Sequence, residues 1–149
     1  MNAVNSDAII EKLRTIAGNK AEIVLDAFFT YIKVSPDDLL TLMQLLRDQL
    51  GMNYLANMTG VDQGEEFELV YHLYAIPDNQ QKLVVKTRVS RDLAELPSIS
   101  SIYPTADWQE REVWDLMGVS FSRHPNLVRV LLPEDFTGHP LRKDFKKEA

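Results

Sequence analysis

The residues best suited to chemistry lie in the last third of the chain. Glu110 and Glu112 could serve as a general acid and a general base, and His124 and His139 could bind a metal ion. Residues two apart on a helix point in different directions, so the two carboxylates do not form a catalytic pair. Each histidine precedes a proline, and the chain has no cysteine to complete a set of metal ligands. We therefore interpret both histidines as turn residues that make ordinary hydrogen bonds.

The sequence also lacks the motifs that bind cofactors or activate a nucleophile. It contains no Gly-x-Ser-x-Gly elbow, no phosphate-binding P-loop and no dinucleotide fingerprint. Without cysteine the chain cannot form a disulfide, a thiolate zinc site or an iron–sulfur cluster held wholly by cysteine. We expect no catalytic, cofactor-binding or metal site in this chain, and no bound cofactor.

Composition and charge narrow the class of protein. A chain of 149 residues with 45% hydrophobic residues predicts a single globular domain. The net charge of −6 argues against binding of nucleic acid. No apolar run is long enough to span a membrane and residues 1–14 do not resemble a signal peptide, so we expect a cytoplasmic protein. Basic residues gather near the C-terminal end, where they are either solvated or dock on an acidic partner or a membrane surface.

The hydrophobic pattern of the first two thirds predicts an α+β domain. Ser35 and Pro36 suit the start of a helix, and leucines follow at helical spacing as far as Gly51. The expected elements are a helix from residue 5 or 6 to Gly18, a possibly bent strand over 22–34, a helix over 36–50, and strands over 53–61, 66–74 and 82–89. The last two strands form an antiparallel hairpin. This order predicts a mainly antiparallel sheet with helices packed on one face, followed by an extended irregular C-terminal segment.

The composition of the chain changes after residue 91, where prolines become frequent. A helix is expected from Thr105 or Asp107 to Met117, followed by short strands over 119–121 and 127–132. The charged residues of that helix fit either a solvated, salt-bridged face or, with Trp108 and Trp114 beside them, a protein interface. No periodic pattern survives from Pro133 onward. We expect a domain over 1–132 and a docking extension over 133–149, although composition alone would equally allow a disordered tail.

The helix and the segment after it also carry a long specific pattern. It runs Glu110-Arg111-Glu112-x-Trp114-Asp115-x-x-Gly118-Val119-x-Phe121, then His124-Pro125-x-Leu127-x-Arg129-x-Leu131, then Asp135-x-x-Gly138-x-Pro140-Leu141-Arg142-Lys143-Asp144-Phe145. This signature resembles that of the C subunit of proton-pumping NADH-quinone oxidoreductase, the 30 kDa subunit family of respiratory complex I. The chain departs from the family pattern at Leu116-Met117, at Asn126 and at Phe136.

The resemblance implies a non-catalytic structural subunit of the peripheral arm at the cytoplasmic face of the plasma membrane. Such a protein docks on the large quinone-site subunit, called D, near the cluster-carrying B and I subunits, and supports electron transfer from NADH to quinone. The assembly has the NADH:quinone oxidoreductase activity, and this chain has no active site of its own. The implied partner-interface residues are Glu110, Arg111, Glu112, Trp114, Asp115, His124, Arg129, Asp135, His139, Arg142, Lys143, Asp144 and Phe145.

Two alternatives stay open at this point. The same signature occurs in the equivalent subunits of energy-converting membrane hydrogenases and coenzyme F420 dehydrogenases, so the electron donor and the quinone are not determined. The other alternative is a stand-alone enzyme, which would need a substrate or cofactor site that the sequence does not reveal.

Overall fold

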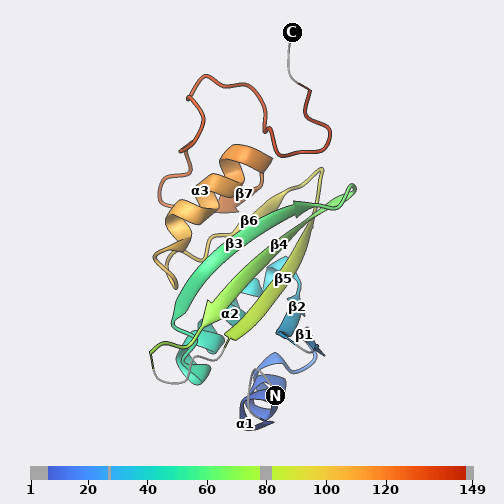
Figure 1. Ribbon diagram of the computed structural model, residues 1–149, viewed down its shortest axis with the longest axis vertical. Helices are drawn as coiled ribbons and strands as arrows, with labels where there is room; N and C mark the ends of the chain where they lie inside the picture. The colour runs from blue at the N-terminus through green and yellow to red at the C-terminus, as the bar shows by residue number, and fades with distance from the viewer. Residues whose placement is uncertain (1–6, 27, 78–81, 147–149) are drawn as a thin grey trace.

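The computed structural model describes residues 7–26, 28–77 and 82–146. Figure 1 shows the arrangement of the elements. The helices are α1 (Asp7–Ala17), α2 (Pro36–Leu50) and α3 (Ala106–Met117). The strands are β1 (Ala21–Leu25), β2 (Thr30–Val34), β3 (Tyr54–Asp62), β4 (Glu66–Tyr74), β5 (Lys82–Ser90), β6 (Glu95–Pro97) and β7 (Ser120–Ser122). The expected start of the first helix at residue 5 or 6 lies outside the described residues.

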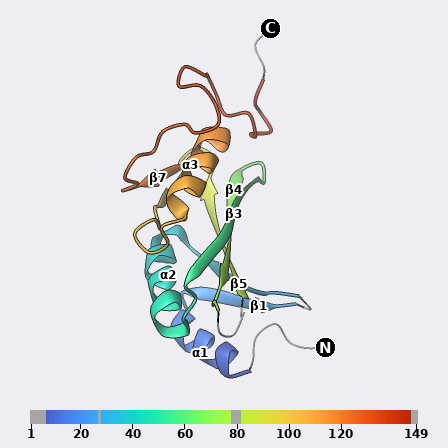
Figure 2. The same ribbon diagram turned by 60° about the vertical axis from the view of Figure 1, so that its left-hand side comes forward.

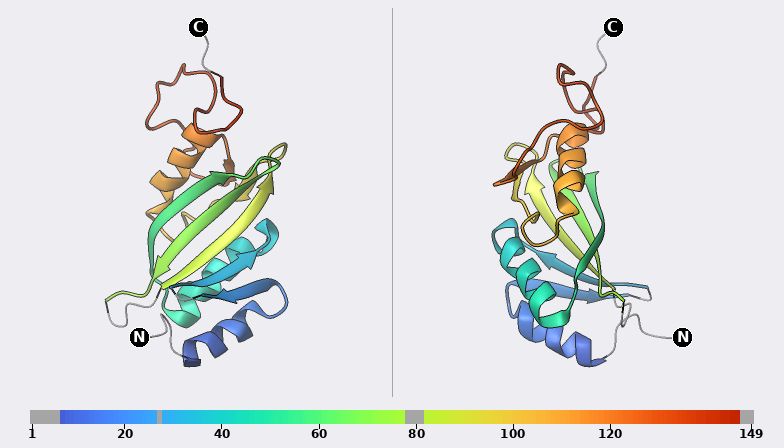
Figure 3. Two further views of the ribbon diagram at one scale, coloured as in Figure 1. Left: turned by 45° about the vertical axis from the view of Figure 1, so that its right-hand side comes forward. Right: turned by 90° about the vertical axis from the view of Figure 1, so that its left-hand side faces the viewer.

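Five strands form one sheet in the order β1-β2-β5-β4-β3. All neighbouring strands are antiparallel except β2 and β5, which pair in parallel. Helices α1 and α2 lie on one face of this sheet, and the opposite face carries no described helix (Figures 2 and 3). β6 and β7 form a separate parallel pair. The fold is therefore α+β with helices on one face, as the sequence predicts.

The core lies between the sheet and α2. On β4, Phe67, Leu69, Tyr71 and Leu73 are fully buried, and they alternate with less buried residues. α2 contributes its apolar stripe from the other side, including Leu39, Met43 and Leu46. Burying one such side chain stabilises the fold by about 1.5–3 kcal/mol. α2 begins at Pro36 and ends before Gly51, whose left-handed φ of 66° suits glycine.

The expected single strand over 22–34 is wrong, because this stretch folds into the β1–β2 hairpin. The turn between the strands is built by Asp26, whose Oδ1 accepts hydrogen bonds from the N–H groups of Phe28 and Phe29, both at 2.7 Å. Aspartate favours such turns because its short side chain competes with the sheet for backbone N–H groups. Asp26 is the one polar signal for a turn in an otherwise strand-like run.

The expected strand over 127–132 is also absent from the structure. Its N–H groups at Val130, Leu131 and Leu132 donate to the carboxylate of Asp115 instead of to a neighbouring strand. A ladder needs those donors, so the carboxylate excludes it. The pair of β6 and β7 was predicted only in part, since Glu95–Pro97 gives no strand signal in the sequence. Residues 123–146 run without helix or strand.

Candidate docking site around the C-terminal segment

Helix α3 provides the platform on which the C-terminal segment lies. It packs against β3 through Val113 and Met117, both buried. Gly60 on β3 makes this approach possible, because a Cβ there would lie 2.5 Å from the sulfur of Met117. Residues 123–146, which we call the tail, then pass back over the C-terminal half of α3 (Figure 1). The site is thus a folded-back tail on a helix.

Asp115 is the centre of this arrangement, and its side chain is fully buried. Oδ2 accepts hydrogen bonds from the N–H groups of residues 130, 131 and 132 at 3.0, 2.7 and 3.0 Å. Oδ1 accepts from Arg129 Nη1 at 2.7 Å. Burial alone would raise the pKa of Asp115, but the guanidinium and the N–H groups outweigh burial and lower the pKa. The carboxylate is therefore charged and fixes an irregular backbone.

Arg129 extends that order further along the tail. Its Nη2 donates to the carbonyl oxygens of Phe136 and Gly138 at 3.0 and 2.8 Å. Its guanidinium also lies over the ring of Phe136, which stacks on Phe145 at a centroid distance of 6.2 Å. A planar guanidinium can satisfy several acceptors at once, which lysine cannot. One arginine therefore ties two turns of the tail to the buried carboxylate.

The C-terminal end of α3 is capped by side chains from the tail. His139 Nδ1 lies 3.0 Å from the carbonyl oxygen of Asp115, and Arg142 Nε donates to the carbonyl oxygen of Met117 at 2.6 Å. The N–H of Leu141 donates to the carbonyl oxygen of Leu116 at 2.8 Å. Carbonyl groups in the last turn of a helix have no partner within the helix, and cations are favoured there. The tail supplies both the donors and the cation.

A second attachment joins the end of the tail to the turn between β3 and β4. Asp62 accepts hydrogen bonds from the N–H groups of Lys143 and Gly64 and pairs with Arg91. Arg91 Nη1 also lies 3.2 Å from Asp144 Oδ1. The Arg91 guanidinium, helped by the backbone N–H groups, holds the pKa of Asp62 well below its usual range. The attachment is therefore ionic over the whole neutral range.

Glu110 and His124 form a buried polar cluster on the other side of α3, and both side chains are fully buried. Glu110 accepts hydrogen bonds from Ser98 Oγ at 2.6 Å and from Ile99 N–H at 2.8 Å. His124 Nδ1 accepts from the N–H of Asn126, so Nε2 carries the proton and donates to the carbonyl oxygen of Asp107 at 2.9 Å. Burial raises the pKa of Glu110 to about 7.

These contacts correct the interpretation of α3 as a solvated charged face, and they bear on the interpretation of the two histidines that follow the helix. Glu110 and Asp115 are not part of a solvated charged face, since neither is exposed. Arg111 lies over the ring of Trp108 and donates to the carbonyl oxygen of Val128, while Glu112 accepts from Trp108 Nε1 at 2.6 Å. The interpretation of His124 and His139 as turn residues with ordinary hydrogen bonds is confirmed.

Several large apolar side chains face outward from α3 and the tail, among exposed charged ones. Leu141 is 58% exposed, Leu131 55%, Trp108 50% and Val128 42%. Leu141 lines a groove between α3 and β3 together with Thr59, Gly60 and Leu116. Trp114 is half-buried against the ring of His139, and Asp135 and Lys143 are exposed. The tail therefore presents Val128, Leu131 and Leu141 to the outside on a backbone of fixed shape.

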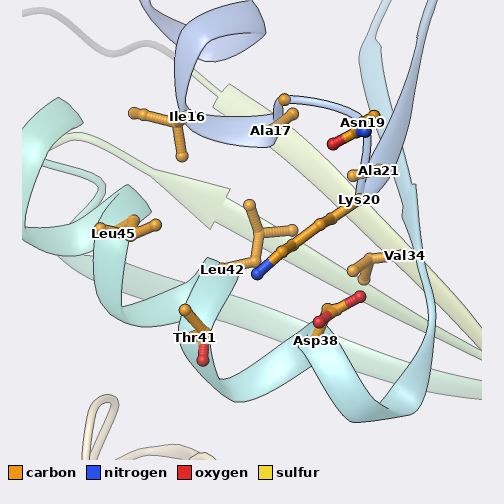
Figure 4. Close-up of a pocket in the computed structure, with 11 residues that line it drawn as sticks. Ile16, Ala17, Asn19, Lys20, Ala21, Val34, Asp38, Thr41, Leu42 and Leu45 are labelled. Carbon is orange, nitrogen blue, oxygen red and sulfur yellow. The ribbon is translucent and has the colours of Figure 1, made fainter.

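A partly open pocket lies away from this site. It is a cavity of about 160 Å³ between α1, α2 and the β1–β2 hairpin. Ile16, Leu42 and Leu45 line it, and Lys20 reaches across it toward Thr41 and Asp38 (Figure 4).

Among the described residues no group of three or more His, Asp or Glu side chains could hold a metal ion. No described helix is long and apolar enough to cross a membrane.

Comparison with known proteins identifies the family. The family model described as respiratory-chain NADH dehydrogenase, 30 Kd subunit, matches residues 32–149. The chain belongs to this family. The NADH-quinone oxidoreductase C subunit of Moorella thermoacetica is 48% identical over 118 residues, which cover 78% of this chain and 79% of that protein. The C subunit of Geotalea uraniireducens is 34% identical over 146 residues, covering 96% and 88%.

Solved structures of similar fold agree with this assignment. A trypsin-resistant fragment of Nqo5 is 25% identical, with a TM-score of 0.69 and coverage of 81% of this chain and 98% of that one. A chain of the membrane-bound sulfane sulfur reductase, an archaeal respiratory membrane complex, is 27% identical, with a TM-score of 0.79 and coverage of 94% and 85%. This member of the 30 kDa family is thus one component of a multi-subunit, complex I-like complex.

The folded-back tail of this family member requires a residue without a Cβ at position 118, which is Gly118. Its φ is 75°, and a Cβ there would lie 2.6 Å from His139 Cδ2 and 2.8 Å from Arg142 Nη2. We expect Gly118→Ala to cost about 1–2 kcal/mol for the backbone and, in addition, to push both capping side chains off the helix end. Gly51 has a similar φ of 66° with nothing within 4 Å, so Gly51→Ala shares only the backbone cost.

The measurement is a thermal melt together with limited trypsin digestion of both variants. Both melting temperatures should fall by a few degrees, but only Gly118→Ala should speed cleavage after Arg142. Equal cleavage rates in the two variants would show that His139 and Arg142 do not hold the tail.

Glu110 predicts a pH dependence of stability. Its pKa is raised to about 7 in the folded protein from 4.5 when unfolded, so the folded state binds more protons between these values. The contribution of Glu110 to the free energy of unfolding should therefore be greatest below pH 4.5 and fall by as much as about 3 kcal/mol as pH rises through 7. Glu110→Gln should remove this contribution. Glu112→Gln, on the exposed side of the same helix, should leave it, as urea denaturation from pH 4 to 9 would show.

Proposed function

We propose that this chain is a non-catalytic structural subunit of the peripheral arm of a proton-translocating NADH-quinone oxidoreductase. It docks on the large quinone-site subunit, near the cluster-carrying B and I subunits, at the cytoplasmic face of the plasma membrane. Electron transfer from NADH to quinone belongs to the assembly. The observation that supports the proposal is the C-terminal segment, where buried charges hold an irregular backbone that carries three exposed apolar side chains, Val128, Leu131 and Leu141.

The energetics of this segment favour a docking role. Burying Asp115 and Arg129 requires desolvation of both charges, and such pairs are rarely net stabilising for a fold. They do fix a geometry, and here that geometry presents Leu131, Leu141 and Val128 to the outside. Apolar and aromatic side chains on a rigid frame are typical of interface centres. We infer that the partner covers this surface.

The relatives point to the same partner. A protein of Shewanella woodyi, named as the C/D subunit of NADH-quinone oxidoreductase, is 36% identical over 154 residues, covering 95% of this chain and 25% of that protein. Its name joins the C subunit with the D subunit. Joining two proteins in one chain raises their effective concentration, which favours contact between them. This supports the large quinone-site subunit, D, as the partner that the tail contacts.

The proposed interface residues have two different roles. Glu110, Asp115, His124 and Arg129 act from inside by shaping the backbone, and His139 and Arg142 act by capping α3. Arg111, Glu112, Trp114, Asp135, Lys143, Asp144 and Phe145 remain partly or fully exposed. We expect the second set to contact the partner directly.

The experiment is a pair of surface substitutions in the assembled complex. Leu141→Asp should leave the melting temperature of the isolated chain within a few degrees, because the side chain is 58% exposed. It should lower association with the quinone-site subunit by about tenfold or more, since an apolar anchor is worth about 1.4 kcal/mol or more. Leu93→Asp, at a position 81% exposed elsewhere, should leave association unchanged. Normal assembly with Leu141→Asp would contradict the proposal.

A second candidate is the equivalent subunit of an energy-converting membrane hydrogenase or a coenzyme F420 dehydrogenase. The likeness to a chain of the sulfane sulfur reductase complex favours keeping it, because that chain shares this fold and comes from a different respiratory complex. The proteins that co-purify with the chain distinguish the two. Flavin- and NADH-binding subunits support the NADH dehydrogenase, whereas a nickel-binding large subunit supports the hydrogenase.

A further inference from the structure

We infer that the outer edge of β3 takes an extended segment of another protein of the complex, which adds a sixth strand to the five-stranded sheet. The segment lies in the groove between β3 and α3 and carries an apolar side chain at every second position. The inference rests on the proposed function only in placing the segment on another protein of the same complex.

β3 is an edge strand whose outer main-chain groups are unpaired, since it pairs only with β4. The N–H of Gln63 donates to the carbonyl oxygen of Glu66 at 2.8 Å, directly beyond the last paired residues of the two strands. In an antiparallel pair, hydrogen-bonded residues alternate with residues whose main-chain groups point away from the neighbouring strand. The groups that point away from β4 are therefore those of Met58, Gly60 and Asp62. None of the described residues forms a hydrogen bond with the main chain of these three.

Only the first part of this edge is closed. There the hydroxyl of Thr105 donates to the carbonyl oxygen of Leu55 at 3.1 Å, and the register shifts between Leu55 and Asn57. Bulges, lysine and proline are devices by which proteins protect an edge from further pairing. Residues 57–62 contain neither lysine nor proline. The other edge strand, β1, is only five residues long. The second part of β3 is thus an unprotected edge, as expected where another strand covers it.

The groove beside this edge suits the side chains of an added strand. Val113, Leu116 and Met117 of α3 line it, the tail adds Leu141, and its volume is about 140 Å³. An apolar cavity of ~150 Å³ can hold a group the size of benzene. Side chains of a strand point alternately to the two faces of the sheet. Every second residue of an added strand would therefore point at α3, and we expect those residues to be apolar.

Strand addition uses the edge and the groove together. The main chain of the segment supplies the missing partners of β3, and its alternate side chains fill the groove, so one feature gives affinity and the other specificity. Because Leu141 of the tail lines the same groove, the segment and the tail belong to one continuous surface.

The surroundings of the edge favour an extended segment over a second copy of this chain. α3 packs on β3 itself (Figures 1 and 3). Two copies joined antiparallel through β3 would place their α3 helices over neighbouring strands ~4.8 Å apart, whereas packed helices need about 8–10 Å between their axes. Glu112 also lines the groove, and each copy has a net charge of −6, so like charges oppose this pairing. An extended segment brings main-chain partners without a second helix.

The test compares amide hydrogen exchange, resolved to single residues, in the isolated chain and in the whole complex. The N–H groups of Thr59 and Val61 point to β4 and should be protected in both, which makes them the internal control. Those of Met58 and Gly60 should exchange at least about tenfold more slowly in the complex, because only there do they have an acceptor. Unchanged exchange at Met58 and Gly60 in an intact complex would overturn the inference.

A matched pair of double variants tests the edge itself. Thr59→Lys with Val61→Lys places two lysines on the open part of β3, at exposed positions where the fold should persist. In the complex it should return exchange at Met58 and Gly60 to the rate of the isolated chain. Thr59→Ser with Val61→Thr keeps the edge uncharged and should retain the protection. Equal protection in the two variants would show that no strand pairs with this edge.

A photoreactive leucine analogue at position 61 identifies the occupant, since Val61 is 38% exposed on the edge strand. Irradiation of the complex should link it to another protein, at a segment with apolar residues at alternate positions. A link to a second copy or within this chain would show a different occupant and refute the inference. If Leu141→Asp lowers association but Met58 and Gly60 stay unprotected in the complex, the proposed function stands and the added strand fails. Absence of the chain from every complex would sink both.

Discussion

Replacing Asp115 with alanine should lower the free energy of unfolding by about 3–5 kcal/mol, the largest effect expected of a single substitution in this protein. The change leaves the Arg129 guanidinium, only 13% exposed, without its carboxylate. It also leaves the N–H groups of residues 130, 131 and 132 without an acceptor. Each unsatisfied buried donor adds to the cost. Urea denaturation of the isolated chain measures the loss.

The matched control is Asp135→Ala. Asp135 belongs to the same signature but is exposed, so its replacement should change stability by no more than about 0.5 kcal/mol. Asp115→Asn tests the charge itself, because an amide keeps the shape but offers one acceptor oxygen in place of two. It should fall between the two alanine variants. Equal stability of Asp115→Ala and Asp135→Ala would refute the central role of the buried carboxylate.

Deleting residues 133–149 should separate stability from docking more sharply than any substitution. No residue over 133–146 is fully buried, so the deletion exposes little of the core. It removes the acceptors of Arg129 Nη2 and the cover of the Phe67 ring by Arg142, which should lower the melting temperature by only a few degrees. Association with the quinone-site subunit should instead fall by several orders of magnitude, because every ~1.4 kcal/mol lost is tenfold.

Two measurements are made on both the full-length and the truncated chain: a thermal melt, and a pull-down with the quinone-site subunit. Unfolding of the truncated chain would assign residues 133–149 to the core, and unchanged binding would refute their docking role. The ionic attachment of Asp62 to Arg91 survives the deletion, since both residues lie in the sheet region. This is why we expect residues 7–132 to keep their fold.

Local sequence was sufficient for the elements whose signals are local. The start of α2 at Pro36, its end before Gly51 and the alternation along β4 follow from helix-capping preferences and from the two-residue period of a strand. The end of α3 before Gly118 follows from the same rule for left-handed caps. The α+β class could be predicted for the same reason. The family could be predicted from the resemblance of the signature to that of the 30 kDa subunit.

Tertiary structure alone decided how the signature is used. The carboxylate of Asp115 binds residues up to 17 positions away and that of Asp62 binds Lys143 across 81 positions, separations at which no local period exists. Burial of Glu110 likewise depends on Ser98 and Ile99, which directly follow β6 where it pairs with β7. By itself the sequence determined which residues carry the family pattern and that cysteine chemistry is excluded. Packing determined which of those charges are buried, because the environment of a carboxylate comes from neighbours that only folding brings together.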